Sequence, residues 1–81
     1  MEIKLIAFGI AKDILEQQHL ALTIEESEIN IKNLKEKLLQ KYPKFAKLQS
    51  LSFAVNEEYQ KDDFLLKDQD EVVIIPPVSG G

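Results

Sequence analysis

Hydrophobic and polar residues alternate over two stretches near the start of the chain. Residues 2 to 8, EIKLIAF, are rich in β-formers and put Ile3, Leu5 and Ala7 on one face. After a glycine and room for one or two helical turns, residues 19 to 25, HLALTIE, alternate again. The pattern predicts two strands joined by a short helical connection.

A helical period replaces the alternation in the next segment. Asn30 is a good N-cap, and Ile29 and Leu34 have the spacing of a hydrophobic staple. Pro43 is expected to end the helix, since the residue before a proline disfavours the α region. One buried stripe is predicted at helical spacing: Ile31, Leu34, Leu38 and Tyr42.

The second half of the chain returns to short strands. Residues 51 to 56 predict a third strand, and residues 59 and 60 a short fourth one. Residues 62 to 70 have the polar composition of a loop, and residues 71 to 75, EVVII, form the last strand. The unbroken apolar run at 72 to 75 is typical of a strand covered on both faces.

This order of elements predicts an α+β fold. We expect a roll in which a mixed sheet of about five strands packs on one main helix. The first and last strands are the most apolar, so they are predicted to lie together in the middle. The 81 residues suffice for one domain, assigned here to residues 1–76, with a flexible tail over residues 77–81.

Composition and charge narrow the class of protein. The sequence has no cysteine, no long apolar run and no signal-peptide pattern at its start, which together favour a cytoplasmic protein without a membrane segment. Between residues 32 and 47, six lysines stand against one glutamate, a net +5 that leaves −9 elsewhere. The chain has no arginine and no interleaved set of aromatic residues for base stacking, so this stretch is interpreted as the solvent face of a helix, and no nucleic-acid partner is expected.

The body of the domain offers no evident set of catalytic groups. His19 is the only histidine, at a strand start, where a half-exposed structural position is expected. The segment at 62 to 71 lacks the central glycine of a calcium loop, so no metal site and no permanently bound cofactor are predicted. The acidic residues gather in predicted turns: Glu25, Glu26, Glu28, Asp62, Asp63, Asp68, Asp70 and Glu71.

The last six residues, PPVSGG, have a composition suited to threading. The two prolines lack N–H donors and end strand pairing. Val78 offers one apolar anchor, Ser79 is small, and Gly80 and Gly81 have no Cβ. Such a tail fits a narrow channel in another protein, where its α-carboxylate becomes reactive once it is activated. The residues therefore point to a small protein whose reactive group is its C-terminus.

Three stretches carry a resemblance to a known family. They are IKLIAFGIAKDI at 3 to 14, FAVN at 53 to 56 and LKDQDEVVIIPPVSGG at 66 to 81. With the roll order and the terminal Gly-Gly, the chain resembles the ubiquitin-like β-grasp superfamily. Within it, the chain is similar over its whole length to the sulfur carrier (small) subunits of molybdopterin synthase.

The resemblance implies a role for the tail. An activating enzyme would use ATP to adenylate the Gly81 carboxylate, which would become a thiocarboxylate, while Gly80 threads beside it. In the large subunit, the sulfur would pass to cyclic pyranopterin monophosphate to make molybdopterin. The small subunit would not be an enzyme by itself, and the family usually forms a heterotetramer. The implied partner contacts are Phe8, Ile75, Pro76, Pro77, Val78 and Ser79.

The chain departs from the family pattern at several positions. Gln69 replaces a common glycine in the turn before the last strand, where we still expect a type I turn. Lys12 stands where relatives often have arginine, which would weaken a bidentate contact. Ile74 and Ile75 stand where the family often has aromatic residues.

Other functions remain open from the sequence. The chain could be a sulfur carrier for thiamine thiazole synthesis, or a ubiquitin-like modifier joined to lysines of target proteins. A third alternative is a plain binding module whose tail is idle.

Overall fold

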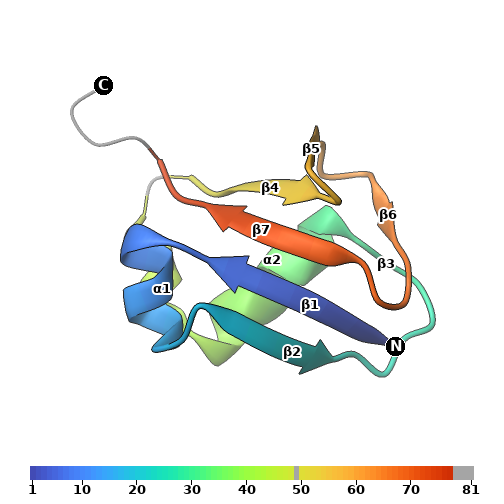
Figure 1. The fold of residues 1–81 in the computed structure, drawn as a ribbon, viewed down its shortest axis with the longest axis horizontal. Helices are drawn as coiled ribbons and strands as arrows, with labels where there is room; N and C mark the ends of the chain where they lie inside the picture. Colours follow the sequence, from blue (N-terminus) through green and yellow to red (C-terminus); the bar gives the residue numbers. More distant parts are fainter. Residues whose placement is uncertain (49, 78–81) are drawn as a thin grey trace.

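The computed structural model describes residues 1–48 and 50–77 of the chain. Figure 1 shows one sheet with the main helix α2 running across its rear face and the short helix α1 at one end. In chain order the elements are β1 (Glu2–Ala7), α1 (Gly9–Leu15), β2 (His19–Thr23), β3 (Ile29–Asn30), α2 (Ile31–Lys41), the 3-10 helix η1 (Pro43–Lys47), β4 (Ser52–Val55), β5 (Glu58–Gln60), β6 (Leu65–Leu66) and β7 (Glu71–Ile75).

The main sheet has five strands in the order β2-β1-β7-β4-β5. β1 and β7 run parallel, whereas β2 on β1, β4 on β7 and β5 on β4 pair antiparallel. The predicted α+β roll is therefore confirmed, with the first and last strands adjacent inside the sheet. A two-stranded sheet of β3 and β6 adds a second pairing, in which Ile29 lies opposite Leu66.

The core lies between the sheet and α2. The alternation of β1 buries Ile3, Leu5 and Ala7, none of which is more than 1% exposed. The stripe of α2 faces them with Ile31, Leu34 and Leu38 buried, and Tyr42 packs at its margin. The helix begins as predicted, because the Asn30 side chain accepts a hydrogen bond of 2.8 Å from the Asn33 backbone N–H.

The other face of the sheet is uncovered, which corrects one expectation. In β7, Val72 and Ile74 are buried but Val73 and Ile75 are only half-buried. The run at 72 to 75 is thus not covered on both faces, because α2 packs against one face only (Figure 1). We call the uncovered side the open face; it carries the residues that alternate with the core positions of each strand.

The segment predicted as a loop at 62 to 70 contains strand β6. Leu66 is buried and pairs with Ile29 just before α2. The Phe64 and Asp62 carbonyls also accept hydrogen bonds from the first backbone N–H groups of α2. A two-residue strand leaves too short a pattern to be recognised in sequence, yet it ties this segment to the start of the helix.

The turn before β7 is not of type I. The Asp70 N–H bonds the Lys67 carbonyl at 3.1 Å, and Gln69, the third residue of the turn, has φ of +71°. Type I requires negative φ at this position, whereas the left-handed region favours glycine. The turn is held in place because the Gln69 N–H donates to the Glu2 carbonyl at 2.6 Å and Asp68 accepts from the Glu2 N–H at 2.7 Å. Gln69 therefore occupies a strained position.

Replacing Gln69 by glycine is expected to stabilise the fold. The substitution removes the left-handed strain, partly offset by the greater backbone entropy of glycine when unfolded, so the free energy of unfolding should rise by about 0.5–1 kcal/mol. Little is lost with the side chain, whose contact to Asp68 is 3.5 Å long. Urea unfolding followed by circular dichroism measures the change. The matched control is Gln69→Ala, which keeps the strain; if alanine stabilises as much as glycine, strain is not the cause.

Candidate functional site

The chain leaves the sheet at the carboxyl end of β7. Ile75 is the last paired residue, opposite Ser52 of β4, and Pro76 and Pro77 follow it, both half-buried. Neither proline has an N–H to donate, so the ladder ends here as the sequence predicts. In Figure 1 this end of β7 lies opposite the end where the N-terminus is found. We call it the tail end of the molecule.

The parallel pairing of β1 and β7 brings Phe8 to the same end. Ala7 lies opposite Ile74, so the next residue along each strand, Phe8 and Ile75, lie side by side. Phe8 has extended backbone angles, φ −131° and ψ 161°, and its side chain alternates with buried Ala7 onto the open face. It is 51% exposed, an unusual degree for phenylalanine in a small domain.

The short connection from β1 to α1 holds the backbone of Phe8 in this position. The Phe8 carbonyl accepts hydrogen bonds from the N–H groups of Ala11 and Lys12 at the start of α1. Gly9 between them has φ of +54°, which an L-residue adopts only with strain. These contacts fix the backbone at Phe8. The Phe8 side chain stays exposed and is not among the residues that pack against the core. Residue Lys12, one of the departures from the family pattern, is exposed on the same short helix.

The open face continues from Phe8 and Ile75 as an apolar row across four strands. Ile6 lies opposite Val73, Val73 opposite Ala54, and Ala54 opposite Tyr59. Tyr59, on edge strand β5, is 72% exposed. We call Ile6, Val73, Ala54 and Tyr59 the apolar row. The apolar row was not predicted, because the register between distant strands, which aligns these residues, is not visible in the sequence.

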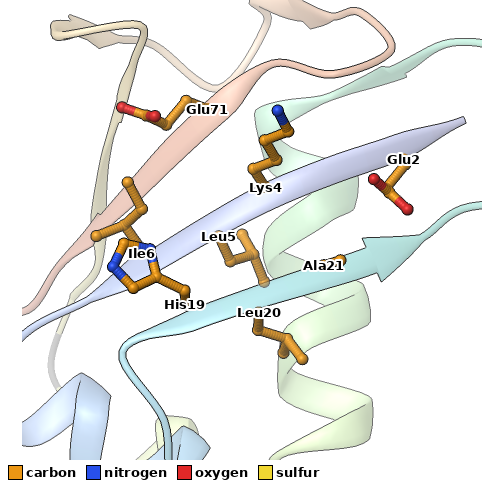
Figure 2. Close-up of a pocket in the computed structure, with 8 residues that line it drawn as sticks. All are labelled: Glu2, Lys4, Leu5, Ile6, His19, Leu20, Ala21 and Glu71. Atoms are coloured by element: carbon orange, nitrogen blue, oxygen red, sulfur yellow. The ribbon is translucent and has the colours of Figure 1, made fainter.

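An open hollow of about 240 Å³ lies on the same face, beyond the apolar row from the tail end (Figure 2). Ile6 and His19 are cross-strand partners at one end of it, and Lys4 and Glu71 are partners further along. Its lining mixes apolar and charged side chains over strands β2, β1 and β7. The hollow widens the open face but is no enclosed cavity for a small molecule.

His19, which was expected to be half-exposed, is exposed on the open face. Other polar side chains hold the backbone of turns. In the turn before β7, the Asp70 carboxylate accepts from the Lys67 N–H at 2.8 Å and from the Asn56 amide at 3.1 Å, and the Asn56 side chain accepts from the Glu71 N–H at 3.1 Å. The Asp70 and Asn56 side chains therefore accept hydrogen bonds from backbone N–H groups, as Asp and Asn in turns commonly do. Among residues 1–48 and 50–77, no three His, Asp or Glu side chains gather as metal ligands would.

The lysines between residues 32 and 47 lie on α2 and η1, on the side of the molecule away from the open face. Those of α2 and η1 are exposed or half-buried, which confirms the solvent-face interpretation. Two form ion pairs: Lys35 with Asp62 at 3.6 Å, and Lys37 with Glu26 at 3.1 Å. The hydrogen bond from the Lys37 ammonium lowers the pKa of Glu26 below its ordinary value. This pair joins a loop to the helix and lies apart from the tail end.

The remaining predicted site residues, Val78, Ser79, Gly80 and Gly81, lie outside the described residues. Of the predicted partner contacts, the structure brings Phe8, Ile75, Pro76 and Pro77 together at the tail end. No helix among the described residues is long and apolar enough to cross a membrane. The site is thus an exposed apolar surface from which a narrow segment of chain departs.

Comparison with known proteins gives this geometry its context. The chain is 35% identical over 82 aligned residues to the molybdopterin synthase sulfur carrier subunit of Arabidopsis thaliana, an alignment covering 100% of this chain and 84% of that protein. A structure from Pyrococcus furiosus described as molybdopterin converting factor subunit 1 superposes with a TM-score of 0.84 at 23% identity, covering 96% and 99% of the two chains. A chain from a Helicobacter pylori complex of subunits 1 and 2 of molybdopterin-converting factor superposes with a TM-score of 0.66 at 24% identity, with 100% of both chains covered.

The family assignment agrees with the fold. The likeness to solved structures shows the β-grasp arrangement that the roll predicts, with a mixed five-stranded sheet on one main helix. The sequence model of the ThiS family matches residues 6–81, nearly the whole chain and including the predicted tail. The chain belongs to the ThiS family of ubiquitin-like β-grasp proteins, and within it to the molybdopterin synthase sulfur carrier subunits.

Proposed function

We propose that this protein carries sulfur for the synthesis of molybdopterin. The observation that carries the proposal is the 35% identity, over the whole chain, to the Arabidopsis sulfur carrier subunit. The physical arrangement supports it, because β7 ends at Ile75 and the two prolines that follow cannot donate hydrogen bonds to extend the sheet. The domain is the part that a partner recognises, and the tail is the part that reacts.

The reactive group in this proposal is the carboxylate of Gly81. One of its oxygens attacks the α-phosphorus of ATP on an activating enzyme, pyrophosphate leaves, and an acyl-adenylate forms. Hydrosulfide, or a donor that delivers it, then attacks the acyl carbon. The bond between this carbon and the AMP oxygen breaks, and AMP leaves. The product is a thiocarboxylate. Gly80 serves by its lack of a side chain, which lets the terminus enter a narrow channel.

Sulfur transfer follows in the large subunit of the synthase. The thiocarboxylate sulfur attacks a carbon of cyclic pyranopterin monophosphate that bears oxygen, and the C–O bond breaks so that the oxygen leaves with phosphate or as water. Water then cleaves the acyl–sulfur bond, which restores the Gly81 carboxylate and leaves the sulfur on the pterin. A dithiolene holds two sulfur atoms, so two carrier molecules with a thiocarboxylate must each donate one sulfur for every pterin. The side chains that handle protons in this step belong to the large subunit, and this protein is a donor subunit rather than an enzyme by itself.

The tail end and the apolar row would form the contact with the large subunit. Phe8 and Ile75 lie side by side where the tail departs, and Pro76 and Pro77 continue the surface. Six extended residues from Pro76 to Gly81 span at most about 20 Å. The reacting carbon therefore lies within that reach of the docked domain. The Helicobacter pylori complex of subunits 1 and 2 supports such an assembly for a protein of the same fold.

Activation of the C-terminus is the first test. Incubated with its cognate activating enzyme, ATP and a sulfide source, the protein should convert to a species in which one oxygen of Gly81 is replaced by sulfur. Intact-mass spectrometry measures this change. The matched control is a variant extended by one alanine after Gly81. Its mass should stay unchanged, because the fold is the same but Gly81 is no longer the C-terminal residue. Equal sulfur incorporation in both proteins would contradict the proposed role of Gly81.

The docking surface is tested by truncating Phe8. Because its ring is 51% exposed and packs in no core, Phe8→Ala should leave the thermal stability nearly unchanged. The affinity of this variant for the large subunit should fall about fivefold or more, because truncating a central aromatic contact costs over about 1 kcal/mol. Isothermal titration calorimetry measures both proteins. The control is Lys32→Ala on the exposed side of α2; if it weakens binding as much as Phe8→Ala, the tail end is not the docking surface.

Genetic complementation separates the competing pathways. We expect the gene to restore molybdenum-enzyme activity in a strain that lacks the molybdopterin sulfur carrier. Restoration of only a thiamine-requiring strain would instead favour the thiazole pathway. Higher-mass conjugates that vanish when Gly81 is deleted would favour a protein modifier.

A further inference from the structure

The outer edge of β2 presents hydrogen-bonding groups that meet no partner strand among residues 1–48 and 50–77. β2 is the first strand of the sheet order, and within this part of the chain it pairs with β1 alone (Figure 1). The Ala7 N–H bonds the Gln18 carbonyl at 2.8 Å, and the Ile24 N–H bonds the Met1 carbonyl at 2.8 Å. In an antiparallel ladder, alternate residues point their backbone groups to the same side. Leu20 and Leu22 therefore bond β1, and the N–H and C=O groups of His19, Ala21 and Thr23 point outward.

The opposite edge of the sheet is protected, whereas β2 is not. β5, at the other edge, has only three residues, begins with Glu58 and is followed by Lys61, Asp62 and Asp63. Short length and charge are common ways of preventing edge strands from pairing. β2 has five residues, HLALT, with no lysine, glutamate, aspartate or proline among them. An uncharged edge of this length is a site for the addition of another strand.

The sequence of β2 is nearly symmetric about Ala21. Leu20 and Leu22 flank it at equal distance, and His19 and Thr23, both polar, follow outside them. We propose that β2 pairs antiparallel with β2 of a second copy of this chain, centred on Ala21. In this register Ala21 of each copy lies opposite Ala21 of the other, and His19 lies opposite Thr23. The proposal does not depend on the sulfur-carrier function.

This register satisfies both the backbone and the side chains. The outward groups of His19, Ala21 and Thr23 form the hydrogen-bonded pairs. Leu20 lies opposite Leu22 of the second copy in a non-hydrogen-bonded pair, where facing side chains approach most closely. The half-buried Leu20 thereby gains an apolar neighbour. No like charges within β2 face each other, because His19 is its only titratable side chain and lies opposite Thr23 of the second copy.

The symmetry of the pair determines what stays accessible. The two-fold axis of an antiparallel strand pair within one sheet runs perpendicular to the sheet, so both open faces point the same way. The two sheets join at their β2 edges, and the two tail ends point in opposite directions along the strands. Phe8 and Ile75 follow β1 and β7, which β2 separates from the second copy, so pairing at the outer edge of β2 leaves them uncovered. A dimer of carriers would therefore present two docking surfaces on one side.

The contact is small, so the dimer is weak. Stable specific interfaces bury about 1,200–2,000 Å² in total, and one five-residue strand pair offers less than this. The formal charge of −4 on each chain also opposes association at low salt. Dimerisation should therefore depend on concentration, with a dissociation constant in the range of weak complexes.

Sedimentation equilibrium of the full chain, over protein concentrations from micromolar to millimolar, tests the pairing. The wild type should pass from monomer to dimer, and Ala21→Pro should raise the dissociation constant at least tenfold. Proline removes the outward N–H of residue 21 without touching the bonds from Leu20 and Leu22 to β1, so the fold is retained. A wild type that is monomeric at the highest concentration, or an Ala21→Pro variant that dimerises as tightly, would overturn the proposal.

The register has its own test in charge pairing. Ala21→Lys and Ala21→Glu should each be monomeric, since like charges then face each other across the axis. An equimolar mixture of the two should form a heterodimer at least as tight as the wild-type dimer. Ser52→Lys is the matched control: it adds one charge to an exposed position of the open face on β4 and should leave dimerisation unchanged. Failure of the mixture to associate, or an equal loss with Ser52→Lys, would overturn the pairing about Ala21.

Discussion

Two strands from opposite ends of the chain, β1 and β7, lie side by side and run in the same direction. This parallel pairing brings the carboxyl ends of both strands to one end of the sheet. Phe8 therefore lies beside Ile75 at the point where the chain leaves the domain. The two prolines that follow have no N–H to donate, so the ladder of β7 ends at Ile75.

One helix on one face completes the arrangement. α2 buries the core side of the sheet with Ile31, Leu34 and Leu38, and no helix of the described part of the chain covers the other side. Apolar residues of the open face, such as Ile6, Val73 and Tyr59, are left at the surface as a consequence. An uncovered apolar face beside a departing tail gives a partner a surface to recognise and a terminus to modify. The same limited cover leaves the edge of β2 available for pairing.

Local patterns predicted most of the fold. The N-cap at Asn30, the buried alternation of β1 and the end of β7 at the prolines each follow from nearest-neighbour physics, and the structure agrees. The errors arose where tertiary context overrides local pattern. The turn at Gln69 adopts positive φ because bonds to Glu2 hold it there, and those bonds join residues far apart in sequence. Strand β6 exists because it pairs with β3, which no periodicity within two residues could indicate.

The candidate site also has one part that the sequence predicted and one part that depends on tertiary structure. Phe8, Ile75 and the prolines were identified from the sequence and its resemblance, while the apolar row needed the register of four strands. The central claim is that the terminal glycine delivers sulfur, and a single-turnover transfer experiment tests it most directly. Carrier labelled with radioactive sulfur at its thiocarboxylate is mixed with the large subunit and cyclic pyranopterin monophosphate. The account predicts that the label leaves the protein and appears in the pterin in equal amount; label that stays on the protein while molybdopterin forms would contradict it.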